Sequence, residues 1–131
     1  MGMTEPIDPE VQEIAQRLFD AARAGHVETL AAYIDAGVPV NLCNEKGDTL
    51  LMLASYHGHA DAVRALIERG ADVDRLNDRG QSPIAGAVFK GAIDVVRVLT
   101  EAGADPHAGH PSAVDSAKMF EREDCLQLWA Q

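Results

Sequence analysis

The spacing of the glycines constrains this chain more than any other feature of its sequence. Three glycines lie 33 residues apart, and three more repeat the interval: Gly25, Gly58, Gly91 and Gly37, Gly70, Gly103. When residues 44–76 are aligned with residues 77–109, twelve positions are identical. A period of this length indicates a repeat protein, in which each unit is one supersecondary element and neighbouring units must stack to bury a continuous core.

Each unit is predicted to fold as a helix, a tight turn, a second helix and an extended hairpin. Thr49 is a suitable N-cap for a first helix that contains the apolar run 50–54. Gly58 ends that helix, because glycine accepts a left-handed conformation without a steric cost. The apolar residues of 62–67 recur at helical spacing and predict the second helix. Gly70 ends it, and residues 71–74 lead out as a hairpin arm.

An acidic residue recurs just inside the start of each second helix, at Glu28, Asp61, Asp94 and Asp124. There a carboxylate faces the positive end of the helix dipole, which contributes roughly 0.3–1 kcal/mol at each position. Part of the acidity of the chain is therefore expected to stabilise its helices rather than to attract a partner.

These units resemble the ankyrin repeats. The resemblance rests on the segment 80–84 (GQSPI), close to the family's G-x-T-P-L, on Gly-His at 25–26 and 58–59, and on 70–74 (GADVD). It covers the chain from about residue 11 to the C-terminus, and it implies an all-α ankyrin-repeat solenoid with hairpin or extended loops. Met52 and Ala85 replace the histidine that follows T-P-L in the family, so the hydrogen bonds of that histidine are expected to be absent.

The chain is therefore expected to be a single domain, 1–131, of about four units including caps. The predicted units are 8–43, 44–76, 77–109 and 110–131. Asp8, Pro9 and Glu10 read as N-cap, first helical residue and first-turn acid of a long opening helix that runs to about Ala24. Its expected apolar stripe is Val11, Ile14, Ala15, Leu18, Phe19 and Ala22. The last unit aligns at an offset of 30 instead of 33, so its hairpin is three residues shorter, as in a terminal cap.

Charge and composition exclude several functions. Twenty-one acidic and 11 basic residues give a formal net charge of −10, which offers no broad basic surface for nucleic acid. The longest apolar stretches fall far short of the roughly 20 residues that span a bilayer. Cys43 and Cys125 lie far apart without a C-x-x-C spacing, which predicts two reduced thiols and a cytoplasmic location, with Cys125 in the core.

Few residues suggest a metal site or an active site. His57 and His59 form an H-x-H pair, and the loop 105–110 offers Asp105, His107 and His110. A tetrahedral site needs three or four convergent ligands, so His59 is interpreted instead as the family's histidine at the turn between helices. The serines lack a nucleophile elbow and the glycines form no nucleotide-binding fingerprint. The sequence predicts no enzyme and no cofactor, and a small metal-binding or catalytic protein is kept as a minor alternative.

The remaining candidate site is a surface. The resemblance implies that partners dock on one concave face, lined by hairpin tips and by the outer ends of the first helices. Matching by repeat position places eleven residues there: Glu45, Lys46, Asp48, Tyr56, His57, Asp78, Arg79, Gln81, Phe89, Lys90 and Met119. Arg23, Ala24 and Phe120 occupy equivalent positions in the terminal units.

Tyr56, Phe89 and Met119 share one repeat position, which predicts an apolar stripe with a charged rim. The alternative is that these side chains fill gaps between neighbouring helices. An exposed stripe favours a non-enzymatic interaction module that presents a rigid surface, and we expect this module to be monomeric. A dedicated inhibitor or regulatory subunit of one partner protein is the second reading, and the net charge suggests a basic partner.

Overall fold

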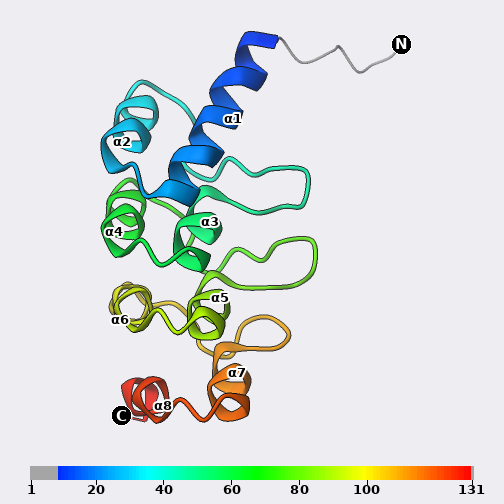
Figure 1. Cartoon of the computed structure of the whole chain (residues 1–131), viewed down its shortest axis with the longest axis vertical. Helices are drawn as coiled ribbons and strands as arrows, with labels where there is room; N and C mark the ends of the chain where they lie inside the picture. Colours follow the sequence, from blue (N-terminus) through cyan, green and yellow to red (C-terminus); the bar gives the residue numbers. More distant parts are fainter. Residues whose placement is uncertain (1–8, 131) are drawn as a thin grey trace.

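The computed structural model describes residues 9–130, and these residues form eight helices in four consecutive pairs (Figure 1). The helices are α1 Pro9–Ala24, α2 Val27–Asp35, α3 Leu50–Tyr56, α4 Ala60–Glu68, α5 Pro83–Lys90, α6 Ile93–Glu101, α7 Ala113–Met119 and α8 Glu123–Trp129.

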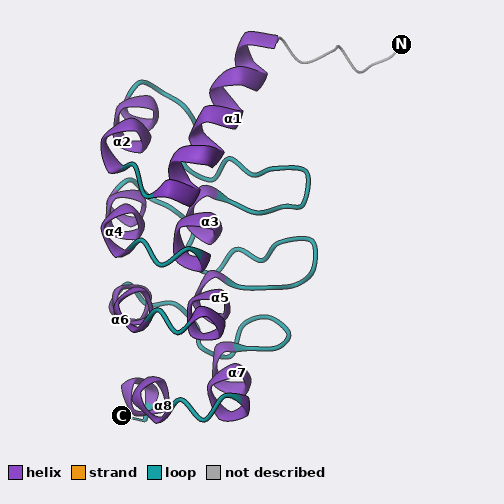
Figure 2. Ribbon diagram, in the orientation of Figure 1, coloured by secondary structure: helices purple, strands orange, loops and turns teal. Residues whose placement is uncertain are grey.

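The pairs stack on one another in two rows. The first helices of the pairs, α1, α3, α5 and α7, form one row, and the second helices form the other (Figure 1). Long loops leave the second helices and project beyond the row of first helices (Figure 2). This confirms the predicted all-α solenoid of helix pairs.

The loops are held without a sheet. The described residues form no strand, only one isolated antiparallel bridge between Cys43 and Thr49. Successive loops are joined instead by a few scattered hydrogen bonds, such as the one from the Asp78 N–H to the Lys46 carbonyl at 3.0 Å. The predicted hairpin arms are thus extended loops, and each loop lies beside the loop of the next repeat.

The sequence explains where the first helices begin. Thr49, Ser82 and Ser112 are N-caps, and the hydroxyl of each accepts a hydrogen bond at 3.1 Å from the backbone N–H three residues later. Each cap satisfies one of the N–H groups that a helix start leaves unpaired. The predicted cap at Thr49 is therefore confirmed, while the cap expected at Asp8 lies outside the described residues.

The second helices begin differently. Their N-cap residues make no side-chain cap, but each first turn carries the predicted acid: Glu28, Asp61, Asp94 and Asp124. The carboxylates thus interact favourably with the dipoles of α2, α4, α6 and α8.

Neighbouring repeats also meet at the turn between the helices. Gly25 has φ +76°, and a Cβ added there would lie 2.6 Å from Nδ1 of His59. Only glycine fits at this left-handed turn. The Nε2–H group of His59 donates to the Arg23 carbonyl at 2.7 Å, so the predicted turn histidine links the first two helix pairs.

The core runs between the two rows along the whole stack. It is made chiefly of Leu, Val, Ile and Ala side chains, as the few aromatic residues of the chain require. The expected stripe of α1 packs against this core, with one exception. Val11 is exposed, because the first turn of α1 extends past the neighbouring α2 (Figure 1).

The two ends of the stack differ from its middle as predicted. Helix α1 has 16 residues, whereas the other helices have 7 to 9. The loops over 36–49 and 69–82 have 14 residues, and the last loop, 102–112, has 11. Cys125 is fully buried in the last repeat, and this burial raises the pKa of its thiol. Within residues 9–130, no helix is long and apolar enough to cross a membrane.

One buried polar group is not satisfied. Ser55 is fully buried in α3, and its hydroxyl has no hydrogen-bond partner among the described residues. An unsatisfied buried hydroxyl costs roughly 1–3 kcal/mol. The next repeat places Val88 at this position, which shows that the stack accepts an apolar side chain there.

We therefore predict that Ser55→Ala stabilises the protein by about 1 kcal/mol, since it removes the unsatisfied hydroxyl and improves helix propensity. Ser82→Ala is the matched control. It truncates an equally buried serine but removes a cap, so it should destabilise by about 1 kcal/mol. Urea unfolding of the two variants measures both effects. A loss of stability in Ser55→Ala would contradict the conclusion that the Ser55 hydroxyl is unsatisfied.

Candidate protein-binding surface

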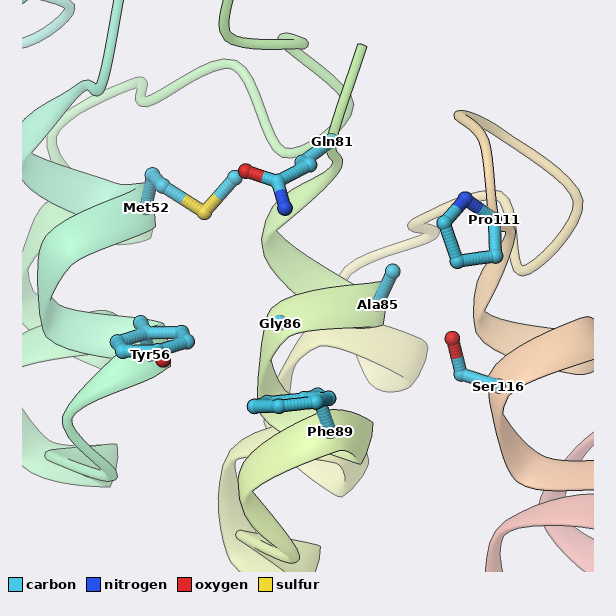
Figure 3. A pocket seen from close by; sticks show the side chains of 8 residues that line it. All are labelled: Met52, Tyr56, Gln81, Ala85, Gly86, Phe89, Pro111 and Ser116. Carbon is cyan, nitrogen blue, oxygen red and sulfur yellow. The ribbon is translucent and has the colours of Figure 1, made fainter. Parts of the chain in front are cut away.

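An apolar hollow lies on the face of the first helices, between α3, α5 and α7 (Figure 3). It has a volume of about 180 Å³. Tyr56 and Phe89 flank it, Gly86 of α5 faces Met52 and Tyr56, and Ala85 of α5 lies on the side toward α7. Its remaining lining residues are Met52, Gln81, Pro111 and Ser116.

Small side chains at one repeat position make room for this hollow. Gly86 and Ser116 stand where the second repeat has Leu53. A Cβ added to Gly86 would lie 3.6 Å from both Met52 Sδ and Tyr56 Cδ1, so it would point into the hollow without a clash. The absence of a side chain at Gly86 therefore keeps the space between α3 and α5 open.

A second, more polar hollow of about 200 Å³ adjoins the first on the side of the loops. The two share Met52, Tyr56 and Gln81 as lining residues, so they lie side by side, and we call them together the groove. The rest of the second hollow is lined by Leu53 and by loop residues: Lys46, Asp48, Asn77 and Arg79.

Asn77 organises the loop that borders the groove. Its Oδ1 accepts from the backbone N–H groups of Arg79 and Gln81 at 3.0 and 2.9 Å. Its Nδ2 donates to Asp48 Oδ1 and to Gln81 Oε1, each at 2.8 Å. Asn77 thus holds two polar groove residues and joins its own loop to the preceding one.

Asn44, one repeat earlier, makes the first pair of these bonds. Its Oδ1 accepts from the N–H groups of Lys46 and Asp48 at 2.9 and 3.0 Å. Because both loops turn around an asparagine, Lys46 and Arg79 occupy equivalent places on them.

Three aromatic rings follow one another along the exposed ends of the first helices. Tyr56 and Phe89 are stacked, with centroids 6.3 Å apart and planes inclined by 11°. Phe120 meets Phe89 edge to face at 5.6 Å. Such pairs are worth roughly 0.5–1.5 kcal/mol beyond the area they bury. We call Tyr56, Phe89 and Phe120 the aromatic row.

The aromatic row is exposed and differs from the predicted stripe at one end. Tyr56, Phe89 and Phe120 are 38%, 58% and 46% exposed. Met119 is 67% exposed, and the ring that reaches Phe89 belongs to Phe120, the C-cap of α7. In the shortened last repeat, the residue beyond the helix thus takes the place predicted for Met119.

Two further residues surround Tyr56. The Lys90 ammonium lies 5.0 Å from the centroid of the Tyr56 ring, and the His57 ring packs edge to face against it at 5.4 Å. Partial burial, reinforced by the neighbouring His59, Lys90 and Arg23, lowers the pKa of His57. The charged form of His57 is therefore disfavoured, and lysine and arginine supply the positive charge around the groove.

The structure brings most of the predicted surface residues together. Six line the groove: Lys46, Asp48, Tyr56, Arg79, Gln81 and Phe89. His57 and Lys90 adjoin Tyr56, whereas Glu45, Asp78 and Met119 line neither hollow.

The sequence analysis did not predict Gly86, which leaves the first hollow open, or Asn77, which organises the loop beside the groove. Asn77 could have been found, because an asparagine recurs at the same repeat position as Asn44. The change from Leu53 to Gly86 is visible in the alignment, but the hollow that it opens depends on how α3 and α5 pack.

The candidate metal ligands do not converge. In residues 9–130 no group of three or more His, Cys, Asp or Glu side chains could hold a metal ion. His59 donates to the Arg23 carbonyl, and Asp105 Oδ1 accepts from the backbone N–H of His107.

Stacked helix pairs with projecting loops and a groove on one face define an α-helical repeat protein with a candidate binding surface. The chain belongs to the ankyrin-repeat family, since the sequence model of the family "Ankyrin repeats (3 copies)" matches residues 18–110. Ankyrin repeats generally mediate protein–protein interaction and are generally not catalytic.

The chain is also similar to a Pseudomonas aeruginosa protein named as a "putative ankyrin repeat protein", with 53% identity over 51 residues. This match covers 39% of the chain but only 30% of the relative.

Asn77→Asp is predicted to loosen the loop at the groove. The substitution replaces two donated hydrogen bonds with a negative charge beside Asp48, which should cost on the order of 1–2 kcal/mol. Amide hydrogen exchange at Arg79 and Gln81 should accelerate accordingly.

Asn44→Asp is the control one repeat earlier. It keeps both bonds that Asn44 Oδ1 accepts, so stability and exchange should change little. Equal effects of the two substitutions would contradict the bridging role of Asn77.

Proposed function

We propose that the protein is a non-enzymatic interaction module that binds a segment of a partner protein in the groove. The observation that carries this proposal is the exposed aromatic row beside an apolar hollow. Aromatic side chains held next to a pocket and surrounded by polar groups are typical of the central residues of protein interfaces.

The size of each separate hollow favours a protein segment over a small molecule. Sites for small molecules and cofactors usually enclose roughly 300–1,000 Å³. The two hollows measure about 180 and 200 Å³ and open on one face. Each suits one or two side chains of a longer segment that continues across the surface.

The groove is also formed before any partner binds. Asn44 and Asn77 fix the loops, and the aromatic row is held by ring contacts. Binding to a preformed surface loses little conformational entropy, which raises affinity for a given contact area.

Several finer expectations remain predictions. They are a monomeric state, a cytoplasmic location and a role as the dedicated inhibitor or regulatory subunit of one partner. The absence of catalysis also belongs here. It is supported by the buried serines Ser82 and Ser112, whose hydroxyls are engaged as helix caps.

Site-specific photo-crosslinking tests the proposed function. With benzoylphenylalanine in place of Phe89, we expect a covalent adduct to a partner protein in cells that express the chain. The same group in place of Arg97, an exposed residue of α6, is the control and should give no such adduct.

Gly86→Leu tests whether the adduct depends on the open hollow. It should fill the hollow, as Leu53 fills the equivalent space, and abolish the adduct formed at position 89. Adducts that form equally from position 97, or that persist with Gly86→Leu, would contradict the proposal.

Phe89→Ala is predicted to weaken binding of the cross-linked partner by about 30-fold, the effect of losing roughly 2 kcal/mol at a central interface residue. Because Phe89 is more than half exposed, the free energy of unfolding should fall by less than about 1 kcal/mol. Calorimetric titration and thermal unfolding measure the two quantities. A loss of about 3 kcal/mol of stability would show instead that Phe89 fills a gap between repeats.

A further inference from the structure

The groove carries positive charge in a chain whose net charge is −10. Among the described residues, five of the eleven basic side chains are ion-paired: Arg23, Arg64, Arg69, Arg97 and Arg122. Lys46 and Arg79, which line the groove, make no ion pair with any described residue.

Fewer acidic than basic residues line the groove with these cations. Asp48 lines the second hollow, and its Oδ1 already accepts from Asn77 Nδ2 at 2.8 Å. Glu45 and Asp78 line neither hollow. The charged lining residues are therefore two unpaired cations and one carboxylate that is already hydrogen-bonded.

We infer that the segment bound in the groove is acidic, with an apolar or aromatic side chain in the first hollow and an Asp or Glu carboxylate near Lys46 and Arg79. This inference rests on the proposed function. The two hollows share Met52, Tyr56 and Gln81, so residues close together in one segment reach both.

Repeat geometry places the two cations where one carboxylate or a pair of them could bind. Lys46 and Arg79 are 33 residues apart, at equivalent places on adjacent loops, and the Lys46 carbonyl accepts from the N–H of Asp78. Hydrogen bonds from arginine or lysine to a carboxylate are about twice as strong as those between neutral groups.

The charges that line the groove affect the bound segment more strongly than the net charge of the chain does. At physiological salt, exposed charges separated by more than about 8 Å are largely screened, so the acidic residues of the outer helices act weakly within the groove. A basic segment would place like charges against Lys46 and Arg79, which disfavours it. The groove thus selects an acidic segment even though the whole chain would attract a basic protein at long range.

Selection from a random dodecapeptide display library on the full chain tests this inference. The enriched peptides should combine Asp or Glu with an apolar or aromatic residue. By fluorescence anisotropy, Lys46→Glu combined with Arg79→Glu should weaken the binding of these peptides by at least about 10-fold.

Arg64→Glu combined with Arg97→Glu is the matched control. It changes the net charge by the same amount, at another repeat-related pair on the outer helices α4 and α6, and should alter binding less than about 2-fold.

The outcomes separate the inference from the proposed function. Enriched peptides that are basic or uncharged but lose binding in Gly86→Leu would overturn the inference and leave the groove as the binding site. Acidic peptides that weaken equally with both double variants would also overturn it. Peptides insensitive to Gly86→Leu and to the groove charges would overturn both proposals, and a selection that enriches no peptide counts against the inference.

Discussion

Burial of apolar surface between successive repeats is the interaction on which the rest of the structure depends. A single helix pair has no interior of its own, so side chains such as Leu66 and Ile84 become fully buried because the next pair covers them. The same stacking sets the spacing of the loops and brings equivalent residues of successive repeats into line. The aromatic row and the equivalent positions of Lys46 and Arg79 on adjacent loops both follow from it.

The groove arises where the repeats differ. If every repeat carried Leu53 at its position, the space between α3, α5 and α7 would be filled, but Gly86 and Ser116 leave it open. Glycine within a helix costs roughly 0.5–1 kcal/mol relative to alanine. The core shared by the stacked repeats supplies the stability that offsets this local cost, so one repeat can give up packing and leave the groove open.

The fold could be predicted almost entirely from the sequence, because the 33-residue period fixes the order of helices and the cap at Thr49 marks a helix start. The candidate site could be predicted only in part. Repeat position brought Tyr56 and Phe89 together correctly, since stacking aligns equivalent residues. It failed for Met119, because the shortened last repeat brings Phe120 to Phe89 instead. Repeat position also did not predict that Lys46 and Arg79 lack ion-pair partners among the described residues, because the ion pairs depend on how the side chains lie in the folded chain.

The central claim is that the groove on the face of the first helices is the binding surface. Titration of the ¹⁵N-labelled chain with the partner captured through position 89, followed by amide chemical shifts, tests it most directly. We expect the largest shifts at Gln81, Gly86 and Phe89. Shifts concentrated on the outer helices, around Arg64 and Arg97, would contradict it.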